Sequence, residues 1–201
     1  MQVKTIKSAE DLEKTTPFNV DKLLWGTKSS PKTYGYLGFI PKDGFYLKMI
    51  CEEKNPYRVY TEANDPVYQD SAMEAFFLFK SQNSKTDAIY LNFEVNANGA
   101  MLAASGKKRN NRIFLSKELR SEITCCTNIL EDRWIVEIHL PVSVLNKVYG
   151  NLILEKGSKF YCNFYKIAER KEIEHYVSFS PIMSETVNFH LPEFFAEAMI
   201  V

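Results

Sequence analysis

The sequence lacks several features that would point to common functions. No apolar run reaches the ~20 residues of a membrane-spanning helix, and the stretch 1–14 has no hydrophobic segment of the secretory-signal kind. Lys plus Arg and Asp plus Glu each number 25, so the formal net charge is zero. We therefore expect neither a nucleic-acid nor a membrane partner, and we expect a cytoplasmic protein.

Motifs of common enzymes and metal sites are also missing. Cys51, Cys125, Cys126 and Cys162 have no C-x-x-C or Cys/His spacing, so no zinc site is expected. The histidines are isolated, and the sequence has neither a Gly-rich phosphate loop nor a G-x-S-x-G elbow. Free cysteines in apolar stretches fit a reducing compartment.

What the sequence does have is aromatic residues and short alternating stretches. It holds 14 Phe and 11 Tyr, which favour β structure. No linker divides it, so we expect one domain over residues 1–201. The pattern predicts an all-β protein, an antiparallel β-sandwich of the immunoglobulin or jelly-roll kind with one or two short helices. Strands are expected at 34–40, 45–52, 67–79, 90–96, 134–140 and 159–167, a polar loop at 81–87 and a helix at 141–149.

The stretch 67–79 organises this prediction. It has the apolar density of a central strand, yet it contains Asp70 and Glu74. A buried charge is costly unless it has a partner or faces a groove. Alternation places Asp70, Glu74 and Phe76 on one side, which predicts a strand that begins at the rim of a cleft. By contrast, Trp25 is interpreted as a core plug or as a staple for the N-terminal segment in preference to a ligand contact, and the basic loop 106–111 as a solvated tip.

Three predicted strands contribute side chains to one polar, aromatic face. Tyrosine offers a flat ring and a hydroxyl, asparagine both donates and accepts, and ionised glutamate accepts. A sugar ring needs this set of partners. The alternative is a ladder of cross-strand pairs with no ligand. The face comprises Glu74, Tyr90, Asn92, Glu94, Asn96, Tyr161, Asn163 and Tyr165.

A second alternative is catalysis. Glu74 and Glu94 have the residue type that a glycoside hydrolase, or an accessory subunit of one, uses as its acid and base. Nothing in their sequence spacing fixes the distance between the two carboxylates. Acidic residues on neighbouring strands also serve as ligand acceptors or surface charges, so we expect a binding protein and not an enzyme.

Several stretches in this order resemble the family 9 carbohydrate-binding modules and their stand-alone relatives, within the wider sugar- and haem-binding sandwich superfamily. They are V-Y-Q-D-S-A-M-E-A-F-F at 67–77, Y-L-N-F-E-V-N-A-N-G at 90–99, W-I-V-E-I-H-L-P at 134–141, N-F-Y-K at 163–166 and F-H-L-P-E-F-F-A at 189–196. The resemblance covers most of the chain from Trp25 onward.

The resemblance implies a β-sandwich that binds a mono- or oligosaccharide without chemistry. The family stacks a sugar between two tryptophans, and Tyr68 and Phe189 occupy those positions here. Glu74 matches an acceptor of sugar hydroxyls, whereas Glu94 stands at a family arginine and Tyr165 at a family glutamine. The expected ligand-binding residues are Tyr68, Glu74, Glu94, Asn163, Tyr165 and Phe189, with Tyr90, Asn92, Asn96, Tyr161 and His190 as secondary candidates.

The same resemblance bears on cofactors. We expect none, although family members can hold structural calcium. A further alternative is haem binding with a methionine or histidine as axial ligand, as in distant superfamily relatives. The identity of the sugar and the oligomeric state stay open.

Overall fold

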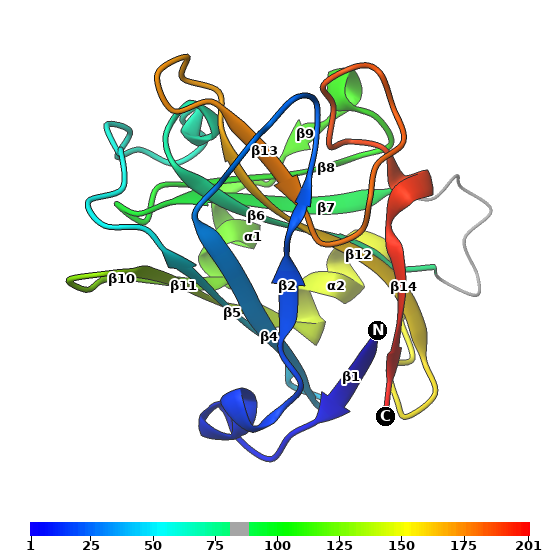
Figure 1. The fold of residues 1–201 in the computed structure, drawn as a ribbon. Coiled ribbons are helices and arrows are strands. Elements are labelled where there is room, and N and C mark those ends of the chain that lie inside the picture. Colours follow the sequence, from blue (N-terminus) through cyan, green and yellow to red (C-terminus); the bar gives the residue numbers. More distant parts are fainter. Residues whose placement is uncertain (81–88) are drawn as a thin grey trace.

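A computed structural model of the chain describes residues 1–80 and 89–201. Within them, eleven of fourteen strands follow one hydrogen-bonded path that curls into two facing sheets, A and B, and the other three pair beside it (Figure 1). Sheet A has the order β9 (Ile113–Phe114), β8 (Met101–Gly106), β7 (Tyr90–Asn96), β6 (Ala72–Leu78), β12 (Lys159–Ala168) and β14 (Ala196–Ile200). The edge of β12 that pairs with β14 also pairs with β13 (His175–Ser178), which in turn pairs with β3 (Lys22–Leu23).

Sheet B contains four strands that lie side by side and one short strand at their edge. They are β10 (Thr124–Ile129), β11 (Trp134–Pro141), β5 (Gly44–Glu52) and β4 (Lys32–Ile40), with β2 (Phe18–Val20) paired to β4. Strand β1 (Gln2–Thr5) joins the two sheets, because Gln2 and Val3 pair with β14 while Lys4 and Thr5 pair with β4.

The pairing of β1 corrects one part of the predicted architecture. Both of its pairings are parallel, whereas the other pairings in the described residues are antiparallel. The predicted antiparallel arrangement is therefore wrong for β1, and the fold is a mostly β, curled mixed sheet consistent with a sandwich. The sequence gives no strand signal at β1, since Val3 is its one buried side chain.

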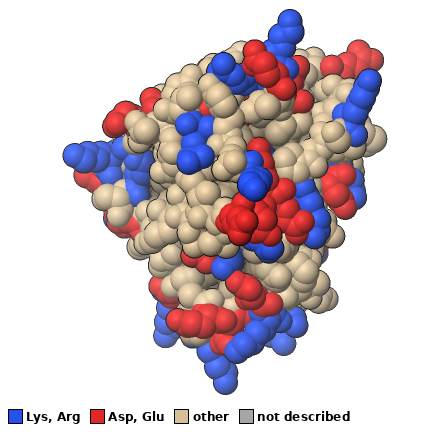
Figure 2. Space-filling view, turned by 60° about the vertical axis from the view of Figure 1, so that its left-hand side comes forward, with Lys and Arg blue, Asp and Glu red and all other residues tan. Residues whose placement is uncertain are grey.

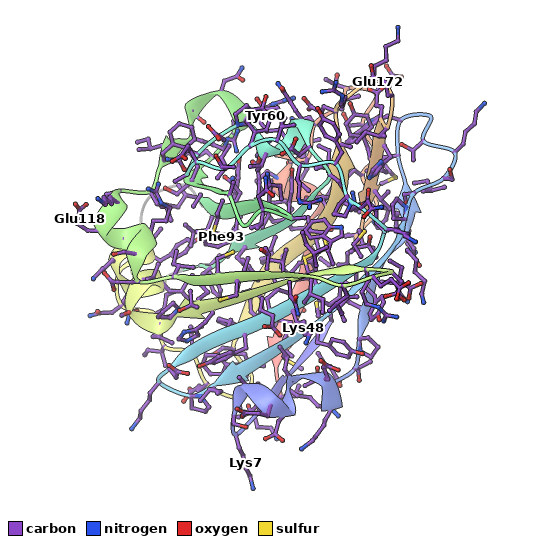
Figure 3. All side chains as sticks on the ribbon, turned by 90° about the vertical axis from the view of Figure 1, so that its left-hand side faces the viewer. Lys7, Lys48, Tyr60, Phe93, Glu118 and Glu172 are labelled. Atoms are coloured by element: carbon purple, nitrogen blue, oxygen red, sulfur yellow. The ribbon has the colours of Figure 1, made fainter. Side chains whose placement is uncertain are left out.

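The main core lies between the two sheets. The alternation predicted for 45–52 is confirmed, because Phe45, Leu47, Met49 and Cys51 are all buried in this core. Phe93 of β7 points into the same interior from sheet A (Figure 3). Because these side chains occupy one face of each strand, the opposite face of sheet A is left to carry polar residues.

Two short α-helices complete the regular structure of the described residues. Helix α2 (Val142–Tyr149) follows Pro141 and ends at Gly150, whose φ of 78° suits glycine, as the sequence predicts. Helix α1 (Lys117–Ser121) begins at Ser116, whose side chain accepts a hydrogen bond from the Leu119 amide. No helix in the described part of the chain is long and apolar enough to cross a membrane.

Four short 3₁₀ segments occur in the described residues, and the second replaces the start of the strand predicted at 67–79. They are η1 (Ala9–Lys14), η2 (Val67–Gln69), η3 (Arg109–Asn111) and η4 (Pro192–Phe194). The strand predicted at 67–79 therefore begins only at Ala72. Asp70 lies between η2 and β6 and is not a strand residue. Its Oδ2 accepts bonds from the amides of Val59 and Tyr60 and from Asn96 Nδ2. The loop predicted at 81–87 lies outside the described residues.

Charged residues of both signs occur on the face of the molecule that Figure 2 shows. Figure 2 shows Lys and Arg interspersed with Asp and Glu over the visible face. This distribution agrees with the balanced composition, in which both kinds of charge number 25.

Candidate functional site

The predicted polar face exists on the outer side of sheet A. Glu74 of β6 lies directly opposite Glu94 of β7 on one side and Tyr165 of β12 on the other. Phe76 is likewise flanked by Asn92 and Asn163. The register thus brings side chains from three strands together, as alternation along each strand predicts.

Much of this face is covered by the segment 179–195, which runs from β13 to β14 across sheet A (Figure 1). Phe189 stacks on Tyr165 with ring centroids 4.1 Å apart, and His190 lies 4.9 Å from the Phe76 ring. Phe195 contacts the same cluster. The outer face is therefore a second hydrophobic core over most of its area, and a smaller part of it reaches solvent.

That smaller part is a pocket of about 470 Å³, including its open mouth. Its floor is formed by sheet A and its walls come from the turn after β3, from η2, from η3 and from the covering segment. The lining residues are Trp25, Tyr68, Glu74, Glu94, Arg109, Arg112, Ile167, Glu169, Tyr176, Val187, Asn188, Phe189 and His190.

Two carboxylates side by side form the floor. Glu94 Oε1 accepts bonds from Arg112 Nη1 at 2.9 Å and from Asn92 Nδ2 at 3.1 Å. Burial raises the pKa of Glu94 to about 6 although Arg112 opposes the rise. Burial, and then the neighbouring charge of Glu94, raise the pKa of Glu74 well above its usual range. Glu74 Oε2 is buried and finds no hydrogen-bond partner among the described residues.

Aromatic side chains form the rim. Trp25 has a φ of 48°, which is unusual for a bulky residue, and with Gly26 it makes a tight turn closed by the Thr27 amide on the Leu24 carbonyl. Its Nε1 donates to the Ser184 carbonyl at 2.7 Å. Trp25 therefore staples the covering segment and not the N-terminal segment, and it also lines the pocket. Tyr68 of η2 is half-buried at the same pocket.

Of the primary candidates, Tyr68, Glu74, Glu94 and Phe189 line the pocket, together with the secondary candidate His190. Tyr165 and Asn163 lie beneath the covering segment instead. The Tyr165 hydroxyl donates to the Phe189 carbonyl. The Asn163 side chain donates to the Ser180 carbonyl and accepts from the Ser180 amide. Their contacts hold the segment in place.

The other secondary candidates also have protein partners. Tyr90 bonds through its hydroxyl with His190 Nδ1, and Asn92 donates to Glu94. Asn96 donates to Asp70 and to the Tyr60 carbonyl, and it accepts from amides of the turn after β7. Tyr161 is half-buried beside Lys80, whose Nζ lies 4.9 Å from its ring centroid.

Arg109, Arg112 and Glu169 are pocket residues that the sequence analysis missed. Arg109 belongs to the basic loop 106–111 interpreted as a solvated tip, and Arg112 directly follows this loop. Arg112 is paired with Glu94, and Arg109 Nη2 lies 3.6 Å from Glu169 Oε1. The sequence does hold one signal for these residues. Glu94 stands in an apolar strand, and a buried carboxylate needs a cation nearby, which points to an arginine or lysine in the pocket.

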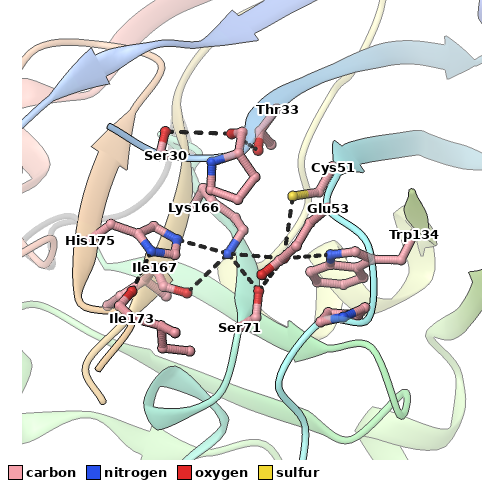
Figure 4. A network of polar contacts seen from close by, with 12 residues as sticks. Ser30, Thr33, Cys51, Glu53, Ser71, Trp134, Lys166, Ile167, Ile173 and His175 are labelled. Carbon is pink, nitrogen blue, oxygen red and sulfur yellow. Dashed lines mark hydrogen bonds and ion pairs between the residues drawn. The ribbon is translucent and has the colours of Figure 1, made fainter. Parts of the chain in front are cut away.

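A second polar cluster lies inside the protein, away from the pocket (Figure 4). Lys166 Nζ donates to Ser71 Oγ at 2.7 Å and to His175 Nε2 at 2.9 Å, and it lies 3.7 Å from Glu53 Oε2. Trp134 also donates to Glu53. Because Lys166 and Ser71 are fully buried, this serine–lysine contact is structural and not an accessible nucleophile.

Metal ligands are sparse in the described part of the chain. Within it, no group of three or more His, Cys, Asp or Glu side chains gathers closely enough to hold a metal ion. These residues therefore offer no carboxylate cluster for the structural calcium that the resemblance raises.

The fold and the pocket define a class: a mostly β protein whose curled mixed sheet, consistent with a sandwich, has a pocket on an outer face that is floored by carboxylates and rimmed by aromatic rings. The chain belongs to carbohydrate-binding family 9, whose family model matches residues 5–200. This membership confirms the resemblance and the predicted carbohydrate-binding function. No curated protein matches the sequence significantly.

Solved structures share the fold. A candidate carbohydrate-binding protein from Bacteroides uniformis is 21% identical, with a TM-score of 0.82 over 100% of this chain and 98% of that one. A family 9 module from Caldicellulosiruptor kristjanssonii in complex with cellotriose is 13% identical, with a TM-score of 0.65 over 100% and 92% of the two chains. Its complex with glucose gives 14% identity, a TM-score of 0.63 and coverage of 100% and 95%.

Proposed function

We propose that the pocket on sheet A binds one sugar ring, either a monosaccharide or the end unit of an oligosaccharide, and that the protein carries out no chemistry on it. The observation that carries this proposal is the buried Glu74 carboxyl, which has an unpartnered oxygen beneath the aromatic rim of Trp25 and Tyr68. A buried polar group without a partner is costly unless a ligand supplies one.

The chemistry of the pocket suits a sugar. Trp25 and Tyr68 offer flat surfaces for the apolar face of a ring, while Glu74 and Arg109 offer an acceptor and a donor for hydroxyl groups. The similar structures with glucose and cellotriose bound support the same ligand class.

Calorimetric titration with glucose, cellotriose and a panel of other sugars tests the proposal. We expect dissociation constants between millimolar and micromolar. Replacing either rim residue, in Trp25→Ala or Tyr68→Ala, should weaken binding at least about fivefold, since a stacked ring contributes ~1 kcal/mol. Tyr36→Ala is the matched control, because Tyr36 is also half-buried but lies on β4 of sheet B. The proposal is wrong if no sugar binds.

The hydrolase alternative uses the same two carboxylates. Glu74 and Glu94 are directly opposite each other on adjacent strands, so both lie on one floor and do not face each other across a bound ring. Glu94 is also held by Arg112, which favours a role in shaping the site. Chromogenic glycosides incubated with the wild-type protein should show no turnover, and turnover that disappears in Glu74→Gln would favour the hydrolase.

A further inference from the structure

The pocket floor is short of hydrogen-bond donors. One buried acceptor atom of the floor, Glu74 Oε2, has no partner among the described residues. The neighbouring acceptor Glu94 Oε1 is already satisfied by Arg112 and Asn92. A ligand that reaches the floor therefore gains most if it brings donors and no acceptor.

The charges of the pocket point in the same direction. Three carboxylates and two guanidinium groups line it. Arg112 is paired with Glu94 and Arg109 with Glu169, so Glu74 is the lining carboxylate to which no described residue supplies an ion pair. Glu74 is 2% exposed and lies on the pocket floor, so a cation must enter the pocket to reach it.

We propose that the preferred ligand is an amino sugar with a free, protonated amino group, and that this ammonium binds Glu74. The inference rests on the proposed sugar site and names the class of sugar. An ammonium has three donors and no acceptor, and its bond to a carboxylate is about twice as strong as a neutral one. A neutral hexose brings a hydroxyl to the same place without the charge, and an N-acetylated sugar has lost the charge.

Binding of the ammonium is linked to a proton. Burial and the charge of Glu94 raise the pKa of Glu74 well above its usual range, which shifts the free protein toward the protonated carboxyl. When the ammonium enters, the carboxyl O–H bond breaks, its proton passes to the buffer, and the resulting carboxylate pairs with the ammonium. The complex therefore gains one positive ligand and releases one proton, and no other reactant is consumed.

The test compares glucosamine, glucose and N-acetylglucosamine by calorimetry at about pH 6.5, where an amine of pKa ~7.7 or above is largely charged. We expect the wild-type protein to bind glucosamine at least about tenfold more tightly than glucose or N-acetylglucosamine. In Glu74→Gln, which keeps the shape but not the charge, glucosamine and glucose should bind within about twofold of each other. Glu52→Gln on β5 of sheet B is the matched carboxylate control and should keep the wild-type preference.

Proton release supplies a second measurement that needs no variant. Wild-type titrations in two buffers of different ionisation enthalpy should give different heats for glucosamine and equal heats for glucose. The inference is overturned if glucose binds as tightly as glucosamine, if the preference survives in Glu74→Gln, or if the heats for glucosamine do not depend on the buffer. Absence of binding by all three sugars would instead overturn the proposed function.

Discussion

His175 is a buried histidine beside a buried lysine. Its Nε2 accepts from Lys166 Nζ and its Nδ1 donates to the Ile173 carbonyl at 2.7 Å, so the neutral ring satisfies both contacts. Protonation would place a second positive charge beside Lys166. Burial, followed by this charge, lowers the pKa of His175 to about 4, although Glu53 opposes the shift.

This pKa predicts acid destabilisation. The unfolded chain takes up the proton near pH 6.5 and the folded chain only near pH 4, so the free energy of unfolding should fall as the pH drops through this window. The slope from one such group is about 1.4 kcal/mol per pH unit. Urea denaturation between pH 8 and pH 4 measures it, and His175→Gln, which retains an acceptor for Lys166, should give a shallower slope. Equal slopes in the two proteins would contradict the prediction.

At the scale of single residues, the sequence could predict which face of a strand a side chain occupies but not which distant residue it contacts. Alternation places Glu74 and Glu94 on the outer face, and the structure has them there. The same alternation places Lys166 on the inner face with Phe164, but nothing in the local pattern indicates that Glu53, 113 positions earlier, lies beside it. Long-range pairing of this kind depends on the packing of the sheets.

At the scale of elements, the covering segment 179–195 decides how much of sheet A remains open. Asn163 anchors it, because the side-chain amide makes bonds of 3.1 and 2.8 Å with the backbone of Ser180. Phe189 then stacks on Tyr165 and also lines the pocket. The pocket wall therefore depends on an anchor that does not itself line the pocket.

Asn163→Ala tests this dependence. The change removes both bonds, each of which contributes about 1 kcal/mol, while strand β12 keeps its backbone pairing. We expect the protein to stay folded, the amides of the covering segment to exchange faster, and sugar affinity to fall several-fold. Hydrogen exchange and calorimetry measure these effects, with Asn128→Ala on exposed β10 as the control. Unchanged exchange in the segment would show that Asn163 is not its anchor.

The strands that could be predicted from the sequence are those with one face packed on the core. Strands β5, β7, β11 and β12 alternate clearly because their inner faces fill the space between the sheets. Strands β1 and β14 are defined by pairing with distant residues, and β1 has a single buried side chain, so hydrophobic periodicity gives little signal there. The start of β6 was placed too early because the apolar composition continues into η2, whose Val67 is buried although it is not in a strand.

At the scale of the whole molecule, β1 ties the sheets together at their common edge. Val3 is fully buried in the main core, which draws side chains from both sheets. The backbone of this strand bonds to the C-terminal strand region, for example through the Val201 amide and the Val3 carbonyl at 2.9 Å. Because the inner faces of the two sheets pack against each other, unfolding of one sheet exposes the inner face of the other.

One shared core predicts one unfolding unit. Val3→Ala removes buried methyl groups at the join and should lower the free energy of unfolding by about 2 kcal/mol. Native-state hydrogen exchange should then show the same decrease for amides of β5 in sheet B and of β6 in sheet A, because both open only in global unfolding. The control is Ile153→Ala, at a residue that is 70% exposed. It should change neither the free energy of unfolding nor the exchange of these amides. A decrease confined to one sheet would mean that the two layers unfold separately and that β1 does not couple them.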